Sequence, residues 1–556
     1  MNFIKNETPT KLRGGYYTDP DIASFLTRWV FEIDPQRLLE PSCGDGVFID
    51  AINQIGNETR RPPSVLAIER DANEAEKTVE RARGLKHVKT QVVTEDFLKW
   101  GLLNISKPCN FDAALGNPPF VRYQYLETKQ QLLMEKVFDL FNLHFTMHTN
   151  AWVPFVILSV AHLRPGGRLA MVVPSEILHV LHAQSLRTFL AGACSKVLII
   201  DPEELWFGET LQGVVLLLAE KKDSASDREH GVAIVQARER SFLTESPESC
   251  FNTADFSNGD MIGGKWMPAL LTRGERALLK DIAHRPDVHR FEQIADVDVG
   301  IVTGANKFFL VTDEVVDRYG LERWAHPMFG RSEHAPGVIY DRATHNANRD
   351  AGLPTNFLWF GTGKPSTFPK KVQEYILMGE AQELDRRYKC RVRTPWYNVP
   401  SVYAAPVGML KRCHDYPRLI LNKFEAYTTD TAYRIRLIAV EAERFVYSFV
   451  NSLTALTAEL EGRHYGGGVL ELVPSEIERL LIPTPHVPVL LEPLNQKIRR
   501  GISAEPLFEI QNTALLQPLG LGKNKQEDLF NAWNRLRMRR QRSRTKEELA
   551  AATVSQ

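Results

Sequence analysis

The chain has 556 residues, of which 43% are hydrophobic and 24% charged, and its 68 basic side chains balance its 68 acidic ones. These values are normal for a soluble globular protein of two to four domains, and they restrict any basic surface for nucleic acid to a local patch. The six cysteines form no CxxC pair and no apolar run is long enough to span a bilayer, which argues against a zinc site, a disulfide framework and a membrane span. The polar stretch 1–15 lacks the apolar core of a signal peptide, so a cytoplasmic location is expected.

The first elements of the chain predict a helix followed by a glycine-containing ligand loop. Apolar side chains recur at helical spacing over 21–31, and residues 14–20 before them predict a loop. A short apolar strand at 37–39 then leads into the segment Glu40–Gly46, whose glycines let a ligand approach the backbone closely. This segment is neither a GxGxxG fingerprint nor a P-loop, and an acidic residue at its start suits a cationic amine better than phosphate.

Polar side chains also follow each of the next three predicted strands. They are Glu69 after the strand 65–68, Asp96 after the strand 88–93 and Asn117 after the strand 111–115. An acidic residue at the end of the second strand is what a Rossmann-like fold uses to hold ribose hydroxyls. Each acid alone could be a helix cap, but polar groups at the carboxyl ends of four successive strands predict one nucleoside-containing ligand.

The tetrapeptide Asn117–Phe120 lies at the carboxyl edge of the fourth predicted strand, where open α/β sheets bind ligands. Its two prolines stiffen the loop and remove two backbone donors, while their carbonyls and the Asn side chain remain acceptors. Such a loop suits a planar amine, whose hydrogens the acceptors hold while the aromatic ring stacks on the base. The alternative is an ordinary proline turn between a strand and a helix.

The remaining predicted elements complete a doubly wound sheet. An apolar helix over 152–163 precedes a turn and a strand at 168–173, and two further strands follow at 197–200 and 214–218. About seven strands therefore alternate with crossover helices, which is the pattern of an α/β fold. A charged, polar stretch follows the last of these strands, so we expect a domain boundary near residue 235.

At this point the motifs resemble those of the gamma class of N6-adenine DNA methyltransferases, which use S-adenosylmethionine. The segments 16–20, 40–46 and 117–120 match the cofactor and catalytic motifs of that class in order, with Phe120 where many members have Tyr. The resemblance implies a Rossmann-like class I S-adenosylmethionine-dependent methyltransferase sheet followed by an α+β target recognition domain. The predicted domains are a catalytic domain over 1–235, a target recognition domain over 236–485 and a helical C-terminal extension over 486–556.

The resemblance also implies a role for each matching residue. The implied cofactor-binding residues are Thr18, Glu40, Pro41, Cys43, Gly44, Asp45, Gly46, Glu69, Asp96, Phe97 and Phe155. The implied catalytic residues are Asn117, Pro118, Pro119 and Phe120. In this scheme Asn117 and the Pro118 carbonyl accept hydrogen bonds from the target amine, while Phe120 and Phe207 stack on the target base. No metal ion is expected.

The chemistry of amine methylation agrees with these parts. An exocyclic aromatic amine is a poor nucleophile, because its lone pair is delocalised into the ring. Two acceptors that hold its hydrogens favour tetrahedral nitrogen and free that lone pair, so positioning and polar contacts carry the catalysis. A base in a duplex must leave the stack to reach such a pocket, which explains the stacking aromatics.

The second half of the chain resembles target recognition regions over roughly 290–485. Residues 297–312 read as two strand-like runs around a loop at 303–306. Candidates for phosphate or base contacts are Arg393, Arg412, Arg418, Lys423, Arg434 and Arg436, unless they are solvated surface charges. The basic run 535–546 either contacts the DNA backbone or forms an exposed tail.

We therefore predict a site-specific methyltransferase that transfers a methyl group from S-adenosylmethionine to N6 of a flipped adenine in double-stranded DNA. Nothing in the chain resembles an endonuclease core, so we expect it to protect host DNA beside a separate cognate restriction endonuclease. The alternatives are an amino-methyltransferase acting on N4 of cytosine, on guanine in ribosomal RNA or on glutamine in a protein, and a non-catalytic DNA-binding protein with a decayed methylase fold.

Overall fold

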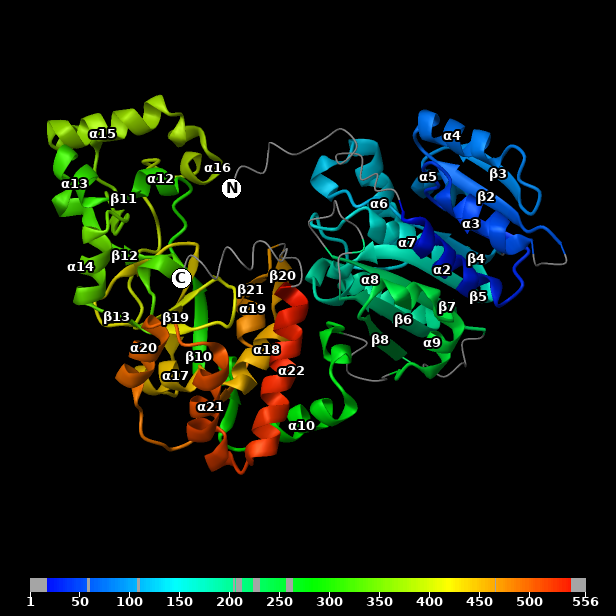
Figure 1. Cartoon of the computed structure of the whole chain (residues 1–556). Coiled ribbons are helices and arrows are strands. Elements are labelled where there is room, and N and C mark those ends of the chain that lie inside the picture. Colours follow the sequence, from blue (N-terminus) through cyan, green and yellow to red (C-terminus); the bar gives the residue numbers. More distant parts are fainter. Residues whose placement is uncertain are drawn as a thin grey trace. The chain divides into compact units, whose positions relative to one another are not determined.

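The computed structural model describes residues 18–57, 61–107, 111–203, 206, 213–223, 231–256, 264–465 and 467–541. These residues form two compact units, and the chain passes from the first to the second between Thr272 and Arg273 (Figure 1). The division lies after the predicted boundary at residue 235. The helices expected to form a separate extension from residue 486 are part of the second unit up to Arg540.

The first unit is built on an eight-stranded sheet in the order β3-β2-β1-β4-β5-β7-β6-β8. Its strands are β1 (Arg37–Glu40), β2 (Ser64–Glu69), β3 (Lys89–Thr94), β4 (Phe111–Gly116), β5 (Leu163–Pro174), β6 (Cys194–Pro202), β7 (Val214–Lys221) and β8 (Gly231–Ala237). All neighbouring pairs are parallel except those of β7, which runs antiparallel to β5 and β6. The predicted α/β sheet is therefore confirmed, with one strand more than the sequence indicated.

Helices cover both faces of this sheet, as apolar runs on its strands require. They are α2 (Pro20–Phe31), α3 (Val47–Gly56), α4 (Ala72–Ala82), α5 (Phe97–Asn104), α6 (Thr128–Leu140), α7 (Trp152–Ala161), α8 (Gln184–Ala193) and α9 (Pro247–Thr253). Side-chain caps fix several helix starts at the carboxyl edge of the sheet, because an Asp oxygen satisfies amides that the helix leaves unbonded. Asp19 caps α2, Asp71 caps α4 and Asp96 caps α5.

The strand β8 and the helix α9 complete the core of the first unit. β8 pairs in parallel with β6 from Lys196 opposite Gly231 to Pro202 opposite Ala237. On α9, the ring of Phe251 lies 4.9 Å from that of Trp29 on α2. Because these elements bury apolar groups of the sheet and of α2, the core of this unit extends beyond residue 235.

The second unit has an α+β architecture, as predicted. Its two larger sheets have the orders β10-β19-β15-β17-β13 and β11-β14-β12-β18. The strands are β9 (Val288–Arg290), β10 (Ala295–Val299), β11 (Leu310–Val311), β12 (Ala325–Phe329), β13 (Ile339–Tyr340), β14 (Asn356–Leu358), β15 (Val407–Leu410), β16 (Arg412–Cys413), β17 (Leu419–Asn422), β18 (Tyr427–Thr428), β19 (Ala432–Leu437), β20 (Arg463–Tyr465), β21 (Val469–Glu471) and β22 (Leu481–Pro483).

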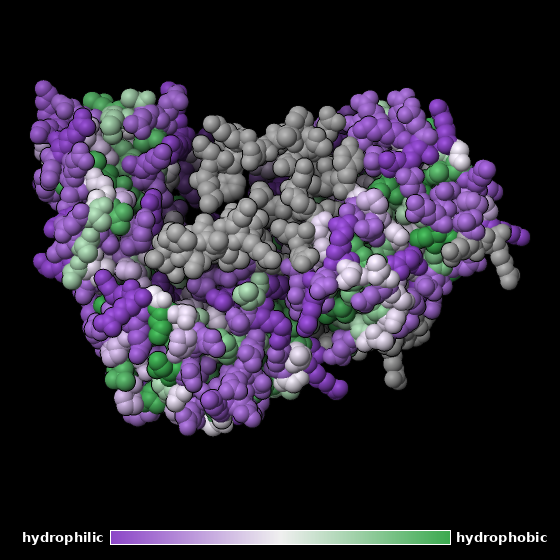
Figure 2. All heavy atoms as spheres, viewed as in Figure 1, coloured by the Kyte–Doolittle hydropathy of each residue, from purple (hydrophilic) through white to green (hydrophobic). Residues whose placement is uncertain are grey.

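The helices of the second unit flank these sheets and form its C-terminal part (Figure 1). They are α10 (Arg273–Ala283), α11 (Phe291–Ile294), α12 (Asn306–Phe309), α13 (Asp313–Tyr319), α14 (Arg342–Asp350), α15 (Lys370–Ala381), α16 (Tyr388–Arg391), α17 (Ala442–Ser448), α18 (Ser452–Glu461), α19 (Pro474–Ile477), α20 (Leu491–Arg499), α21 (Ala504–Leu515) and α22 (Lys523–Gln541). Hydrophilic residues predominate on the face shown in Figure 2, as expected when the apolar side chains fill the cores. Within the described ranges, no helix combines the length and the apolar character needed to cross a membrane.

One local prediction for the second unit was wrong. Residues 307–309 were read as the start of a second strand, whereas they belong to the short helix α12, and the strand β11 begins only at Leu310. The helix turns Phe308 into an aromatic cluster, where its ring lies 4.6 Å from Tyr375 and 5.0 Å from Trp396. Packing of the two adjacent phenylalanines therefore overrides their local preference for a strand.

Candidate active site

The carboxyl ends of β1 to β4 surround a cavity of about 450 Å³. Of the predicted cofactor residues, those that line it are Thr18, Pro41, Cys43, Gly44, Asp45, Glu69, Asp96, Phe97 and Phe155. The predicted catalytic residues Asn117 and Pro119 line it too. Residues from four strand ends and from α7 are therefore brought to one cavity, of a size that suits a small-molecule ligand. The described part of the chain contains no cluster of His, Cys, Asp and Glu side chains arranged to hold a metal ion.

Glu69 at the end of β2 anchors the glycine loop that follows β1. Its Oε2 accepts a hydrogen bond of 3.0 Å from the backbone nitrogen of Gly44, and its Oε1 accepts one of 2.8 Å from that of Asp71. The loop turns through glycines at positive φ, with Gly46 at +89° just before α3. Gly46 does not line the cavity, so its contribution is to the turn.

Glu40 at the end of β1 is fully buried beside the cavity. Neither of its carboxylate oxygens has a hydrogen-bond partner among the described residues. Burial raises the pKa of Glu40 well above its ordinary value, and repulsion from Glu69 and Asp45 raises it further. A buried carboxylate without partners is costly, so this position favours a proton or an approaching cation.

Asp96, two phenylalanines and a glutamine that the sequence analysis missed also line the cavity. Asp96 Oδ1 accepts a 2.8 Å bond from the backbone nitrogen of Leu98, which fixes the start of α5. Its Oδ2 accepts a 3.2 Å bond from Nε2 of Gln130 on α6, and Gln130 also lines the cavity. The rings of Phe97 and Phe155 lie 5.1 Å apart and present an apolar surface next to this carboxylate.

The tetrapeptide Asn117–Phe120 is held from two sides at the end of β4. Asn117 Nδ2 donates a 3.2 Å hydrogen bond to Thr18 Oγ1, and the backbone oxygen of Asn117 accepts one of 3.0 Å from Ser42 Oγ. Thr18 thus engages the nitrogen end of the amide. Pro118, within this loop, is buried.

Of the two residues expected to stack on a base, the structure describes only Phe120. Phe120 is half-buried and packs against the core of the first unit, and it does not line the cavity. Phe207 lies outside the described residues, as do Tyr16 and Tyr17 of the N-terminal motif.

The basic residues that the sequence nominated for DNA contacts in the second unit have partners within the protein. The guanidinium groups of Arg393, Arg418 and Arg434 donate to backbone carbonyls at 2.6–2.8 Å. The other candidates form ion pairs: Arg412 with Glu471, Lys423 with Glu443 and Arg436 with Asp296. Three of the six therefore brace loops, and three sit in paired positions at the surface.

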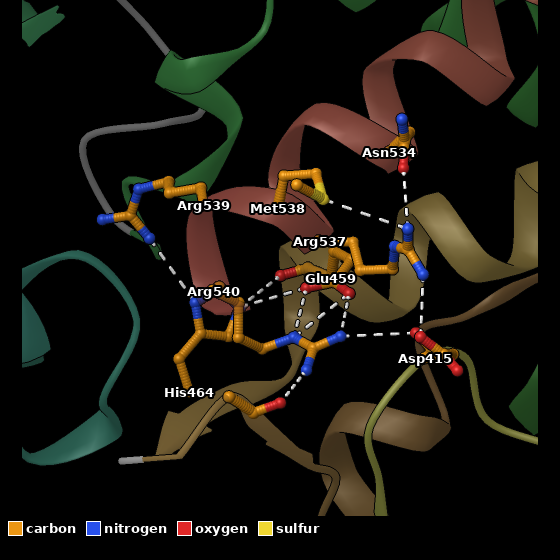
Figure 3. Close-up of polar contacts among 9 residues, drawn as sticks. Asp415, Glu459, His464, Asn534, Arg537, Met538, Arg539 and Arg540 are labelled. Atoms are coloured by element: carbon orange, nitrogen blue, oxygen red, sulfur yellow. Dashed lines mark hydrogen bonds and ion pairs between the residues drawn. The ribbon is translucent and has the colours of Figure 1, made fainter. Parts of the chain in front are cut away.

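The C-terminal basic run also has internal partners, as far as Gln541. Arg540 on α22 forms a bidentate pair with Glu459 of α18, and both side chains are fully buried (Figure 3). Its Nη1 also donates to the carbonyl of Gly468, in the hairpin between β20 and β21. Arg537 pairs with Asp415 at 2.7 Å. These arginines fasten α22 to the second unit, so the interpretation as an exposed tail was wrong for the described part of the run, whereas a contact with the DNA backbone stays a prediction.

The sheet order and the cavity at its carboxyl edge define the fold of class I S-adenosylmethionine-dependent methyltransferases. Residues 2–261 match the family model described as N-6 DNA Methylase, and residues 263–516 match the one described as Type II methyltransferase M.Eco57I, C-terminal domain. The chain therefore carries the two domains of a DNA methyltransferase of the restriction-modification type, as its motifs predicted.

Two curated relatives align with most of the chain. Type II methyltransferase M.AccI of Acinetobacter calcoaceticus is 21% identical over 483 residues, which cover 84% of each chain. Type II methyltransferase M.XamI of Xanthomonas campestris pv. amaranthicola is 22% identical over 500 residues, or 85% of each chain. Among solved structures, the Type IIL restriction-modification enzyme MmeI in complex with DNA is 13% identical, with a TM-score of 0.48, over 96% of this chain and 74% of that one.

Proposed function

We propose that this protein transfers a methyl group from S-adenosylmethionine to N6 of an adenine that is flipped out of double-stranded DNA. The observation that carries the proposal is the position of the Asn117–Phe120 loop at the rim of a cavity whose walls are acidic and aromatic. The match to the N-6 DNA Methylase model supports the same assignment. Because the second unit matches a type II methyltransferase domain, the methylation is proposed to be site-specific.

The carboxylates and aromatic rings around the cavity fit S-adenosylmethionine. Glu40 is a buried acceptor without a partner among the described residues, which suits the cationic methionine end of the cofactor. Glu69 is the acceptor for ribose hydroxyls, and Asp96 with Phe97 and Phe155 suits the adenine ring. When bound, the cofactor supplies an electrophilic sulfonium methyl group, so no further activating base is required.

The catalytic loop would hold the target amine. Asn117 Oδ1 and the carbonyl of Pro118 accept its two hydrogens, which draws the nitrogen toward tetrahedral geometry and makes its lone pair available. The hydrogen bond between Asn117 Nδ2 and Thr18 Oγ1 keeps the amide in the orientation that presents its oxygen. Phe120, adjacent to this loop, would contact the base, and Phe207 is proposed as its second aromatic partner.

The same reasoning ranks the alternative substrates. Asn rather than Ser at the first position of the tetrapeptide favours adenine over N4 of cytosine. The second unit, with its match to a type II methyltransferase domain, favours DNA over ribosomal RNA or a protein glutamine. The intact cavity and loop favour an enzyme over a non-catalytic DNA-binding protein.

The biological setting is proposed from the relatives. M.AccI and M.XamI carry the name type II methyltransferase, and MmeI was solved in complex with DNA. By analogy, this protein would modify host DNA in the cytoplasm and protect it from a separate cognate restriction endonuclease.

The experiment that tests the function supplies radiolabelled S-adenosylmethionine with genomic DNA, total RNA or a protein extract in parallel. We expect label in DNA, and nucleoside chromatography of that DNA should identify N6-methyladenine. Label in N4-methylcytosine would identify cytosine instead of adenine as the target base, and label confined to RNA or protein would refute the proposal.

Replacing Glu69 tests the cofactor site. Glu69→Ala removes the proposed ribose acceptor and the anchor of the glycine loop, so the affinity for S-adenosylmethionine should fall about 10- to 100-fold. Isothermal titration calorimetry measures this loss, with Glu76→Ala as a matched control because Glu76 is an exposed carboxylate on the neighbouring helix α4. Equal affinity in the two variants would show that Glu69 does not contact the cofactor.

Replacing Glu40 tests the buried acceptor through pH. Because the pKa of Glu40 is higher in the folded chain than in the unfolded chain, where it is 4.5, protonated Glu40 stabilises the cofactor-free fold at pH values below 4.5. This stability is lost as the pH rises through the pKa of the folded chain. Glu40→Gln cannot ionise, so its stability relative to the wild type should increase with pH while its affinity for S-adenosylmethionine decreases. Thermal unfolding at several pH values measures the first effect, and parallel curves for both proteins would contradict it.

A further inference from the structure

A short exposed segment of the second unit carries an unusual density of positive charge. Residues 386–392, which directly precede Arg393, read RRYKCRV, and α16 lies within them (Figure 1). Every side chain in this segment is exposed except Cys390, which is buried. Tyr388 is 67% exposed and Val392 is 68% exposed. We call residues 386–392 the basic ridge.

The basic ridge is fixed to the unit at both of its ends. Leu384 before it and Cys390 within it are buried in the aromatic core around α12 and α15. After it, Arg393 donates hydrogen bonds of 2.7 and 2.6 Å to the carbonyls of Thr303 and Val302. Trp396 Nε1 donates to Glu380 at 3.1 Å. The exposed side chains therefore project from a backbone that the core holds in place.

Three of the four cations of the basic ridge have no ion pair among the described residues. Arg386 pairs with Glu383, but within the described ranges Arg387, Lys389 and Arg391 have no ion pair with a carboxylate. Lys389 Nζ lies 5.6 Å and Arg391 Cζ 5.4 Å from the centre of the Tyr388 ring. Cation–π attraction thus gathers two charges around an exposed aromatic side chain.

These charges differ from the arginines that sequence alone nominated. Three of those residues donate hydrogen bonds to backbone carbonyls, namely Arg393, Arg418 and Arg434. The other three form ion pairs with carboxylates of the protein, namely Arg412, Lys423 and Arg436. An approaching anion competes with those contacts. Within the described ranges, Arg387, Lys389 and Arg391 have no paired carboxylate to displace, so these three cations remain available to a polyanion.

We propose that the basic ridge binds the DNA backbone, with Arg387, Lys389 and Arg391 contacting phosphates and Tyr388 packing against the sugar or base between them. The proposal rests on DNA being the substrate. Most polar contacts to DNA go to phosphate and sugar, and they fix register and orientation without reading sequence. Because the whole chain has zero net charge, affinity for a polyanion must come from such a local surface.

The role assigned to the basic ridge is positioning. Phosphate contacts release condensed counterions, so each contact contributes about 0.9 to the slope of log affinity against log salt concentration. Loss of three contacts should reduce that slope by up to about 2.7 and should weaken binding to all sequences alike. Cofactor affinity should not change, because the cavity lies entirely in the first unit.

The test compares two triple variants of the full chain with the wild type. The first is Arg387→Gln, Lys389→Gln, Arg391→Gln. The matched control is Arg500→Gln, Lys523→Gln, Lys525→Gln, which removes the same charge from exposed positions of α20, α22 and their surroundings. Fluorescence anisotropy measures binding of a labelled duplex over a series of NaCl concentrations, and calorimetry measures binding of S-adenosylmethionine.

We expect the ridge variant to show a weaker affinity and a smaller salt slope, and the control to match the wild type. The ridge proposal is overturned if both variants bind DNA as the wild type does, or if both lose the same slope. A failure of the wild type to bind duplex DNA at low salt would instead refute the proposed function, which separates the two outcomes. Tyr388→Ala should bind DNA about two- to five-fold more weakly than Tyr388→Phe, which keeps the ring. Equal affinities of these two variants would show that the ring does not contact DNA.

Discussion

Asn117→Ala should lower the rate of methyl transfer about 100- to 1000-fold while leaving the affinity for S-adenosylmethionine close to that of the wild type. The side-chain oxygen of Asn117 is proposed to hold the target amine, and its orientation is preset by the hydrogen bond to Thr18. Removing a preorganised acceptor raises the barrier for the reacting state more than it weakens binding of the ground state.

Single-turnover methylation with saturating cofactor and DNA measures this effect without interference from product release. Asn252→Ala is a suitable control, because Asn252 is an exposed asparagine of the same unit on α9, far along the chain from the catalytic loop. A variant that retains its rate would remove Asn117 from the mechanism. A variant that loses cofactor binding would assign to Asn117 a structural role in the cavity.

Arg540→Ala should destabilise the second unit by about 3–5 kcal/mol, because it leaves the carboxylate of Glu459 buried without its main cationic partner. Both side chains of this pair are fully buried, and the guanidinium also holds the carbonyl of Gly468 (Figure 3). Denaturation in urea measures the change, with the fluorescence of the buried Trp533 on α22 among its reporters.

Two further variants distinguish the buried pair from a partly exposed one. Arg537→Ala removes an arginine one turn away whose side chain is 21% exposed and whose partner Asp415 is 57% exposed. Water can hydrate the carboxylate that remains, so this variant should cost less than Arg540→Ala. The double variant Glu459→Leu, Arg540→Met removes both buried charges and should recover most of the stability. Equal costs for Arg540→Ala and Arg537→Ala would contradict the argument.

The pair of Glu459 and Arg540 should also make the stability of the fold depend on pH. Burial alone would raise the pKa of Glu459, but Arg540 and His464 lower it below its ordinary value of 4.5. Because the folded pKa is lowered, the pair stabilises the fold above pH 4.5 and this contribution is lost as pH falls toward the folded value. The double variant should lack that loss.

Local patterns in the sequence predicted the catalytic half of the molecule well, because each signal there depends on neighbours in the chain. Buried strands end in polar residues, and Glu69, Asp96 and Asn117 each follow a strand that the structure contains. Parallel pairing of those strands then brings their carboxyl ends to one edge of the sheet, without further information from distant residues.

The features that sequence analysis missed depend on contacts between distant segments. Gln130 stands in an ordinary helical pattern and acquires its role only because α6 packs near Asp96. Arg393 and Arg434 look like free cations in the sequence, whereas tertiary structure supplies carbonyls for them. The helix α12 likewise depends on packing of Phe308 against α15 and Trp396.

The dependence of the first unit's core on its last helix has a consequence for synthesis on the ribosome. The helix α2 is made early, yet Phe25 packs against Phe242 and Trp29 against Phe251 of α9. Domains fold as they emerge, and pairings distant in the chain close late. A nascent chain stalled before α9 therefore offers an uncovered apolar face of α2 to chaperones, whereas a chain from which Thr272 has emerged carries α2 together with both of its aromatic partners.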